Sequence, residues 1–199
     1  MSPSATLPSL DSAFVASASE YQILEKPSRS GRKLRIICLG GGASALNLAH
    51  EVSISSLDLD LVCYEKNPSI GGTWVWMRYP SVNYQFSWAP STEWSHYYSS
   101  ASEILQYFKD VAEKYDLNKY VRLNHTVVGA TWVEEEQKWH VRIQQGNNPD
   151  DVITDKADIF INASGVLKYA SKWKWPDISG RETFKGPMLH SANWMTALS

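Results

Sequence analysis

The sequence has little cysteine, no excess of charge of one sign and no long apolar run. Its 199 residues include two cysteines, Cys38 and Cys63, each inside an apolar, strand-like run, so we expect two buried, reduced thiols rather than a disulfide framework. Nineteen basic residues against 21 acidic ones give a net charge of -2. This balance excludes the basic surface with which nucleic-acid-binding proteins neutralise phosphates.

Signals for membrane insertion, secretion and metal binding are also missing. The first thirty residues lack a basic start followed by an apolar stretch, and so predict no secretory signal. No apolar run approaches the roughly 18 residues of a membrane span. We therefore expect a soluble, cytoplasmic protein. The sequence contains neither zinc-ligand spacing nor a nucleophile elbow, and we predict no metal site.

Tryptophan, in contrast, is abundant. The chain has nine tryptophans, and aromatic residues crowd the stretch 74–98. Such a stretch either forms core or lines a pocket for a flat, apolar ligand, and composition does not decide between the two.

The chain divides into an arm and one domain. Residues 1–33 are rich in Ser, Ala and Pro and are predicted to be a flexible N-terminal arm. Folded structure then begins with a buried strand over 34–39, a glycine turn, a helix to about residue 53 and a second buried strand over 60–65. Strand, turn, helix and strand in this order form a βαβ unit with a parallel strand pair.

A helix and an antiparallel meander are predicted for the next part of the chain. Ser100 and Glu103 make a capping box at the start of an amphipathic helix. Three strand-like runs joined by polar turns then predict a β-meander over about 124–157. A buried strand over 158–163 returns to the parallel sheet. The predicted fold class is α/β, a Rossmann-like domain of a parallel sheet flanked by helices, with the meander inserted.

The glycine turn has the pattern of a dinucleotide-binding turn. Gly40, Gly42 and Ala45 fit G-x-G-x-x-G/A, in which the second glycine lets the backbone approach a pyrophosphate and the third residue lets helix and strand pack closely. The helix N-terminus adds free N–H groups and the positive end of its dipole. Glu65 alone would be interpreted as a solvated carboxylate, but after this turn it is predicted to bind ribose hydroxyls. An acidic residue there argues against a 2′-phosphate, which favours FAD or NAD over NADP.

Beyond this turn the sequence resembles the flavin-containing and Baeyer–Villiger monooxygenases. Residues 65–74, EKNPSIGGTW, are similar to the family segment that ends in Gly-Gly-Thr-Trp and runs beside the flavin. Residues 162–167 resemble the family's Ala-Thr-Gly strand end, and 184–194 fit the fingerprint F-x-G-x-x-x-H-x-x-x-W. The resemblance covers about 34–194. It implies FAD as the cofactor and cofactor-binding roles for Gly72, Thr73, Trp74, Ser164 and Gly165.

Two departures from the family pattern change what the resemblance implies. The run Tyr79-Pro80 passes almost directly into Asn83-Tyr84, without the family segment that carries an aspartate near the flavin ring. The chain also ends at Ser199, before the family's NADPH-binding unit and the segment that completes its FAD domain. We therefore expect one incomplete FAD-type domain over 34–199, which is not a self-sufficient NADPH-dependent monooxygenase. A homodimer or a partner chain is expected to cover its exposed face.

Acid–base chemistry has four candidate residues near the aromatic stretch. Imidazole moves protons near neutral pH, and Tyr or Arg can stabilise an oxyanion. The alternative is that these side chains only tie the loop down. The histidines elsewhere are interpreted as a surface or turn residue, His125, and as part of a linker, His190. The four candidates are His96, Tyr84, Arg78 and Glu93.

Three functions remain compatible with these features. The first is an FAD-binding oxidoreductase derived from a flavin monooxygenase, which acts on an apolar secondary metabolite with a partner that supplies reduction. The second is a non-redox enzyme, such as a cyclase, isomerase or dehydratase, that reuses the fold with FAD lost or only structural. The third is an inactive remnant or a binding protein.

Overall fold

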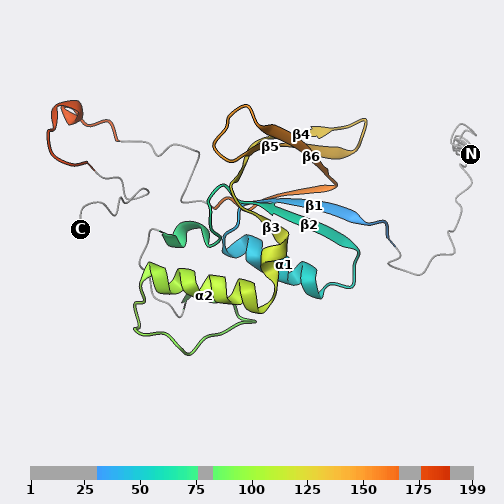
Figure 1. The fold of residues 1–199 in the computed structure, drawn as a ribbon, viewed down its shortest axis with the longest axis horizontal. Helices are drawn as coiled ribbons and strands as arrows, with labels where there is room; N and C mark the ends of the chain where they lie inside the picture. Colours follow the sequence, from blue (N-terminus) through green and yellow to red (C-terminus); the bar gives the residue numbers. More distant parts are fainter. Residues whose placement is uncertain (1–30, 76–82, 166–175, 189–199) are drawn as a thin grey trace, which may run out of the picture. The chain divides into compact units, whose positions relative to one another are not determined.

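A four-stranded parallel sheet forms the centre of the domain. The computed structural model describes residues 31–75, 83–165 and 176–188. Within them, β1 (Leu34–Leu39), β2 (Leu59–Tyr64), β3 (Val121–Arg122) and β7 (Ile159–Asn162) are ordered β3-β2-β1-β7 (Figure 1). All three strand pairs are parallel. The apolar runs of β1 and β2 are covered on both faces, as parallel strands require.

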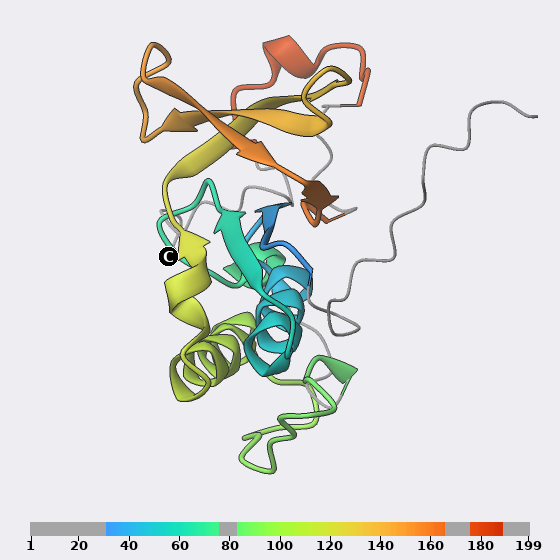
Figure 2. The same cartoon turned by 90° about the vertical axis from the view of Figure 1, so that its right-hand side faces the viewer.

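Two helices cover one face of this sheet. They are α1 (Ala43–Ile54) and α2 (Ala101–Lys114). Alternate strand residues, such as Cys38 and Leu61, pack against the helices in one hydrophobic cluster. The residues between them, such as Ile37 and Val62, belong to a second hydrophobic cluster with residues of the meander. Figure 2 shows the helices on one side of the parallel strands and the antiparallel sheet on the other. This alternation follows from the two-residue period of a strand.

The predicted meander covers the other face of the sheet. Its strands β4 (His125–Val133), β5 (Lys138–Gln145) and β6 (Val152–Ala157) form an antiparallel sheet in that order. Buried Val141, Ile143 and Ala157 pack against Ile37 and the other inward residues of the parallel sheet. The helices, the parallel sheet and the meander therefore make three layers, which confirms the predicted fold class.

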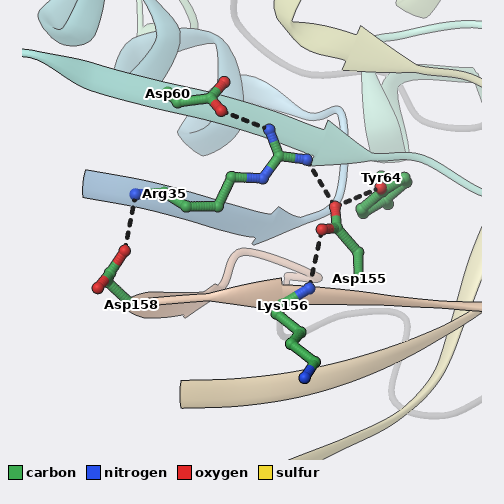
Figure 3. Close-up of polar contacts among 6 residues, drawn as sticks. All are labelled: Arg35, Asp60, Tyr64, Asp155, Lys156 and Asp158. Carbon is green, nitrogen blue, oxygen red and sulfur yellow. Dashed lines mark hydrogen bonds and ion pairs between the residues drawn. The ribbon is translucent and has the colours of Figure 1, made fainter. Parts of the chain in front are cut away.

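The junction between the meander and β7 is fixed by a carboxylate. Asp158 lies between β6 and β7, where its Oδ2 accepts from Arg35 N at 2.9 Å (Figure 3). Its Oδ1 pairs with Lys138 Nζ at 2.6 Å and also with the guanidinium of Arg32. The hydrogen bond from Lys138 is the largest of the effects that hold the pKa of Asp158 well below its usual range. The donors on Arg35 and Arg32 act in the same direction. Asp158 thus joins β1, β5 and the return of the chain to the parallel sheet.

The two cysteines are buried and free, as predicted. Cys38 and Cys63 stand side by side on β1 and β2 and are 0% exposed. The hydrogen bond with Cys38, together with burial, raises the pKa of the Cys63 thiol. Both thiols therefore behave as small core side chains.

In its described part, the aromatic stretch packs into the hydrophobic cluster that the helices share with the parallel sheet. Trp74 is 7% exposed, and its ring lies 4.4 Å from Tyr84 and 6.0 Å from Phe108. The ring of Phe86 stacks on that of Trp88 at 4.5 Å, and the ring of His50 on α1 also stacks on Trp88, at 3.7 Å. Of the two alternatives for these residues, the contacts favour core.

No helix in the described ranges is long and apolar enough to cross a membrane.

The predicted capping box of α2 forms only in part. Ser100 Oγ accepts from Glu103 N at 3.2 Å, as expected for the N-cap. The Glu103 carboxylate turns away from the cap, however, and accepts from Ser95 N at 2.7 Å and Ser95 Oγ at 2.9 Å. It therefore fixes the preceding loop as well as starting the helix.

Candidate dinucleotide-binding site

A cavity of about 510 Å³ lies at the carboxyl ends of the central strands. β1 pairs with β2 on one side and β7 on the other, so the cavity sits where the order of strands reverses. Open α/β sheets bind ligands at this point. The wall contains segments from both ends of the domain: Leu39, Gly40, Gly42, Ala43, Ser44, Tyr64, Glu65, Lys66, Asn67, Gly71, Gly72, Thr73, Trp74, His125, Thr126, Val127, Ala163, Ser164 and Gly165.

The first two motif glycines differ in how much room their surroundings leave for a side chain. Gly40 has a φ of +113, and a Cβ there would lie 2.8 Å from Ala163 O. The backbone itself therefore requires glycine at this position. Gly42 has a φ of -85, and its Cβ would meet only Gly72 Cα at 3.7 Å. The fold therefore has room for a methyl group at Gly42, and packing within the chain does not require glycine there.

The N-terminus of α1 is open toward the cavity. Its N-cap is Gly42, which has no side chain to cap the helix, and the first turn carries no acidic residue. Ala43 and Ser44 at this end both line the cavity. By comparison, α2 starts with the Ser100 cap and Glu103 in its first turn. Uncapped N–H groups and the positive end of the dipole suit a phosphate group.

Glu65 is held in the wall by the glycine turn. The residue is 5% exposed, and its Oε2 accepts from Gly41 N at 2.7 Å. Its Oε1 accepts from Asn67 N at 2.8 Å and from Asn67 Nδ2 at 2.6 Å. A carboxylate has about four lone-pair sites, so three donors leave capacity for a hydroxyl donor. The interpretation as a solvated carboxylate is wrong, since Glu65 is buried and orders the turn.

The predicted flavin-side residues line the same cavity. Gly71 N donates to Gly41 O at 2.9 Å, which brings the Gly-Gly pair against the glycine turn. Gly72, Thr73 and Trp74 belong to a short 3₁₀ helix, Gly72–Val75. The predicted cofactor residues that line the cavity are Gly40, Gly42, Glu65, Gly72, Thr73, Trp74, Ser164 and Gly165. Ala45 is 0% exposed behind them, in the packing position that the motif gives its third residue.

His125 was predicted as a surface or turn residue, but the structure places it in the cavity wall. The backbone N–H of His125 donates to Glu65 O at 2.9 Å, and the ring Nδ1 lies 2.6 Å from Leu123 O. Its ring lies 5.7 Å from that of Tyr64. The physical reason is that the meander starts beside the end of β2. The short strand β3, which pairs with β2, brings it there.

None of the three described acid–base candidates lines the cavity. Tyr84 packs on Trp74, and neither Glu93 nor His96 lines the cavity wall. Glu93 and His96 are exposed on the loop before α2, where His96 Nδ1 lies 2.9 Å from Ser95 Oγ. Arg78 and His190 lie outside the described residues. Among the described residues, no three His, Cys, Asp or Glu side chains are grouped as metal ligands would be.

Comparison with known proteins gives the same assignment of the fold, and the relatives that it finds include FAD-binding monooxygenases. Residues 38–108 match the family model described as an NAD(P)-binding Rossmann-like domain. The chain is 37% identical to the FAD-binding monooxygenase tazF of Aspergillus terreus, over 94% of this chain and 35% of the relative. It is 32% identical to a Baeyer-Villiger monooxygenase of Streptomyces coelicolor, over 81% of this chain and 30% of the relative.

A solved structure supports the same relationship. The crystal structure of OTEMO in complex with FAD and NADP superposes with a TM-score of 0.65 at 29% identity. The match covers 82% of this chain and 31% of that one. The chain thus spans about a third of the length of the proteins that it matches.

Proposed function

We propose that this chain, whose relatives are FAD-binding and Baeyer–Villiger monooxygenases, is an FAD-binding domain that holds the cofactor through its adenosine diphosphate half. The observation that carries the proposal is the meeting of three features in one cavity. These are the open backbone at Gly42, the uncapped N-terminus of α1 and the buried carboxylate of Glu65. Together they match the pyrophosphate and ribose of a dinucleotide.

Each part of the cofactor then has its own residues. Gly42 and the first turn of α1 would hold the pyrophosphate, and Glu65 would accept from the ribose hydroxyls. Gly72, Thr73 and Ser164 would lie toward the flavin. A second negative charge beside Glu65 is unfavourable, so the site selects against a 2′-phosphate. Bound FAD would supply the two-electron chemistry that a flavin brings to an oxidoreductase.

The reaction itself is proposed to depend on further polypeptide. The full activity of the relatives belongs to proteins about three times as long. In the described sheet β7 is an edge strand, and its Ile159 is 40% exposed. An apolar sheet edge favours association. We propose that a second copy or a partner chain covers β7, that a partner supplies the reductant, and that the substrate is an apolar secondary metabolite.

Light scattering on the purified chain tests this association. We expect a dimer or a larger species at micromolar concentration, because β7 is an edge strand of the described sheet and pairing there would add backbone hydrogen bonds. A chain that stays monomeric at that concentration, and does not associate with other polypeptides in the cell, would rule the association out.

The absorbance spectrum tests FAD binding. After incubation with FAD and gel filtration, we expect the protein to keep the yellow flavin absorption. FMN is the matched control, because it carries the same flavin without the adenosine half. It should be lost on the same column. A folded chain, as judged by circular dichroism, that keeps neither flavin would contradict the proposal.

A further inference from the structure

Tyr64 connects the cavity wall to the meander. It ends β2, directly before Glu65, and lines the cavity although it is 6% exposed. Its hydroxyl donates to Asp155 Oδ2 at 2.8 Å (Figure 3). Asp155 lies on β6, 91 residues further along the chain. The side chain of this cavity-lining residue is therefore held by the meander.

Asp155 is itself fixed by other donors. Arg35 Nη2 on β1 pairs with Asp155 Oδ2 at 2.6 Å, and Lys156 N donates to Asp155 Oδ1 at 2.8 Å. Arg35 is anchored on its other side by Asp60, at 2.9 Å. Burial, and after it the hydrogen bond to Asp155, raises the pKa of Tyr64 to about 12. The phenol therefore stays a hydrogen-bond donor. The contact between Tyr64 and Asp155 is thus set by three strands.

In the proposed binding mode Glu65 meets the ribose. The base would then enter the part of the cavity that is lined by Tyr64 and the start of β4. The rings of Tyr64 and His125 lie 5.7 Å apart and are tilted by 33°. Aromatic rings of this kind supply flat, apolar surface against a base.

We propose that Asp155 is a positioning residue for the dinucleotide, which acts by fixing the Tyr64 ring against the base. This inference rests on the proposed function, since it assumes that an adenosine diphosphate group enters the cavity. Asp155 does not line the cavity and would touch no ligand there. The role that it supports is orientation of the wall, because a wall fixed in advance loses less conformational freedom when the ligand binds.

If the contact between Tyr64 and Asp155 were only structural, its loss would change the stability of the fold and not the affinity for the dinucleotide. The sheet around Tyr64 is held by the six-residue register between β1 and β2, and Asp158 separately ties the meander to it. Loss of the Tyr64 hydroxyl should therefore leave the fold intact. In the Tyr64→Phe variant, Asp155 would still pair with Arg35.

The test is a double-mutant cycle read by isothermal titration with ADP. We expect Tyr64→Phe and Asp155→Ala each to weaken ADP binding about fivefold, the equivalent of one hydrogen bond, and the double variant to bind no more weakly than either single one. Inorganic pyrophosphate should bind all variants equally, because it reaches α1 and not the Tyr64 wall. Asp60→Ala is the matched control, since it removes a partner of Arg35 without touching Tyr64, and its ADP affinity should match wild type.

Three results would overturn the inference. ADP affinity that is unchanged in Tyr64→Phe and Asp155→Ala would reduce the contact to a structural one. Losses that simply add would show that the two side chains act independently. A wild-type chain that binds no ADP would overturn the proposed function as well. If Asp155→Ala does not fold, Tyr64→Phe against Asp60→Ala decides alone.

Discussion

Replacement of Gly42 by alanine is expected to weaken FAD binding about 10- to 100-fold without unfolding the chain. The fold accepts a methyl group at this position, because its Cβ would meet Gly72 Cα at an ordinary 3.7 Å and the backbone φ is -85. The pyrophosphate does not accept it, since it must approach the same backbone to reach the N–H groups of α1. The Gly42→Ala variant should therefore lose affinity for FAD and keep the stability of the fold.

The measurement is a titration of FAD into the variant, followed by flavin fluorescence, with a melting curve beside it. Gly129→Ala is the matched control, because a Cβ at Gly129 meets nothing within 4 Å and the residue does not line the cavity. Both variants should melt close to wild type, and only Gly42→Ala should lose affinity. Wild-type affinity in Gly42→Ala would mean that no phosphate sits over this turn. Gly40 is unsuitable for this test, since alanine there would collide with Ala163 O.

Replacement of Glu65 by glutamine is expected to cost FAD affinity tenfold or more and also to lower the melting temperature. The three groups that surround the carboxylate, Gly41 N, Asn67 N and Asn67 Nδ2, are all donors. The amide NH₂ of glutamine must therefore face a donor. A buried donor left without an acceptor costs about 1–3 kcal/mol. The same NH₂ removes an acceptor that the ribose would use.

Glu103→Gln provides the comparison for this variant. Glu103 also accepts from a backbone N–H, that of Ser95, but it is only partly buried and does not line the cavity. It should bind FAD as wild type does, whereas Glu65→Gln should not. If Glu65→Gln melts lower but binds FAD normally, Glu65 only orders the turn, and the ribose lies elsewhere.

Local sequence was sufficient for most of the elements and for the glycine turn with Glu65, whereas the residues predicted beside the flavin came from the family resemblance. The βαβ unit, the meander and the glycine turn each depend on residues that are near one another in the chain, and all are present. Gly42 and Glu65 were predictable because the motif fixes their distance from the strand ends. The packing role of Ala45 followed from the same pattern.

Features that depend on contacts between distant segments were not predictable in this way. Tyr64 meets Asp155 across 91 residues, and no local pattern indicates that pair. His125 enters the wall only because β3 joins β2 and carries the start of the meander with it. The aromatic stretch has no periodicity, so its packing on α2 became visible only in three dimensions. Glu93 and His96 were nominated by residue type alone, and the fold leaves both outside the cavity wall.

A crystal structure of the chain grown with FAD measures the position of the cofactor directly. We predict that the pyrophosphate lies over Gly42 at the N-terminus of α1, with the ribose hydroxyls in hydrogen-bond distance of Glu65 and the base against Tyr64. FAD bound at another surface, or a cavity without electron density for FAD at saturating concentration, would contradict binding at this site.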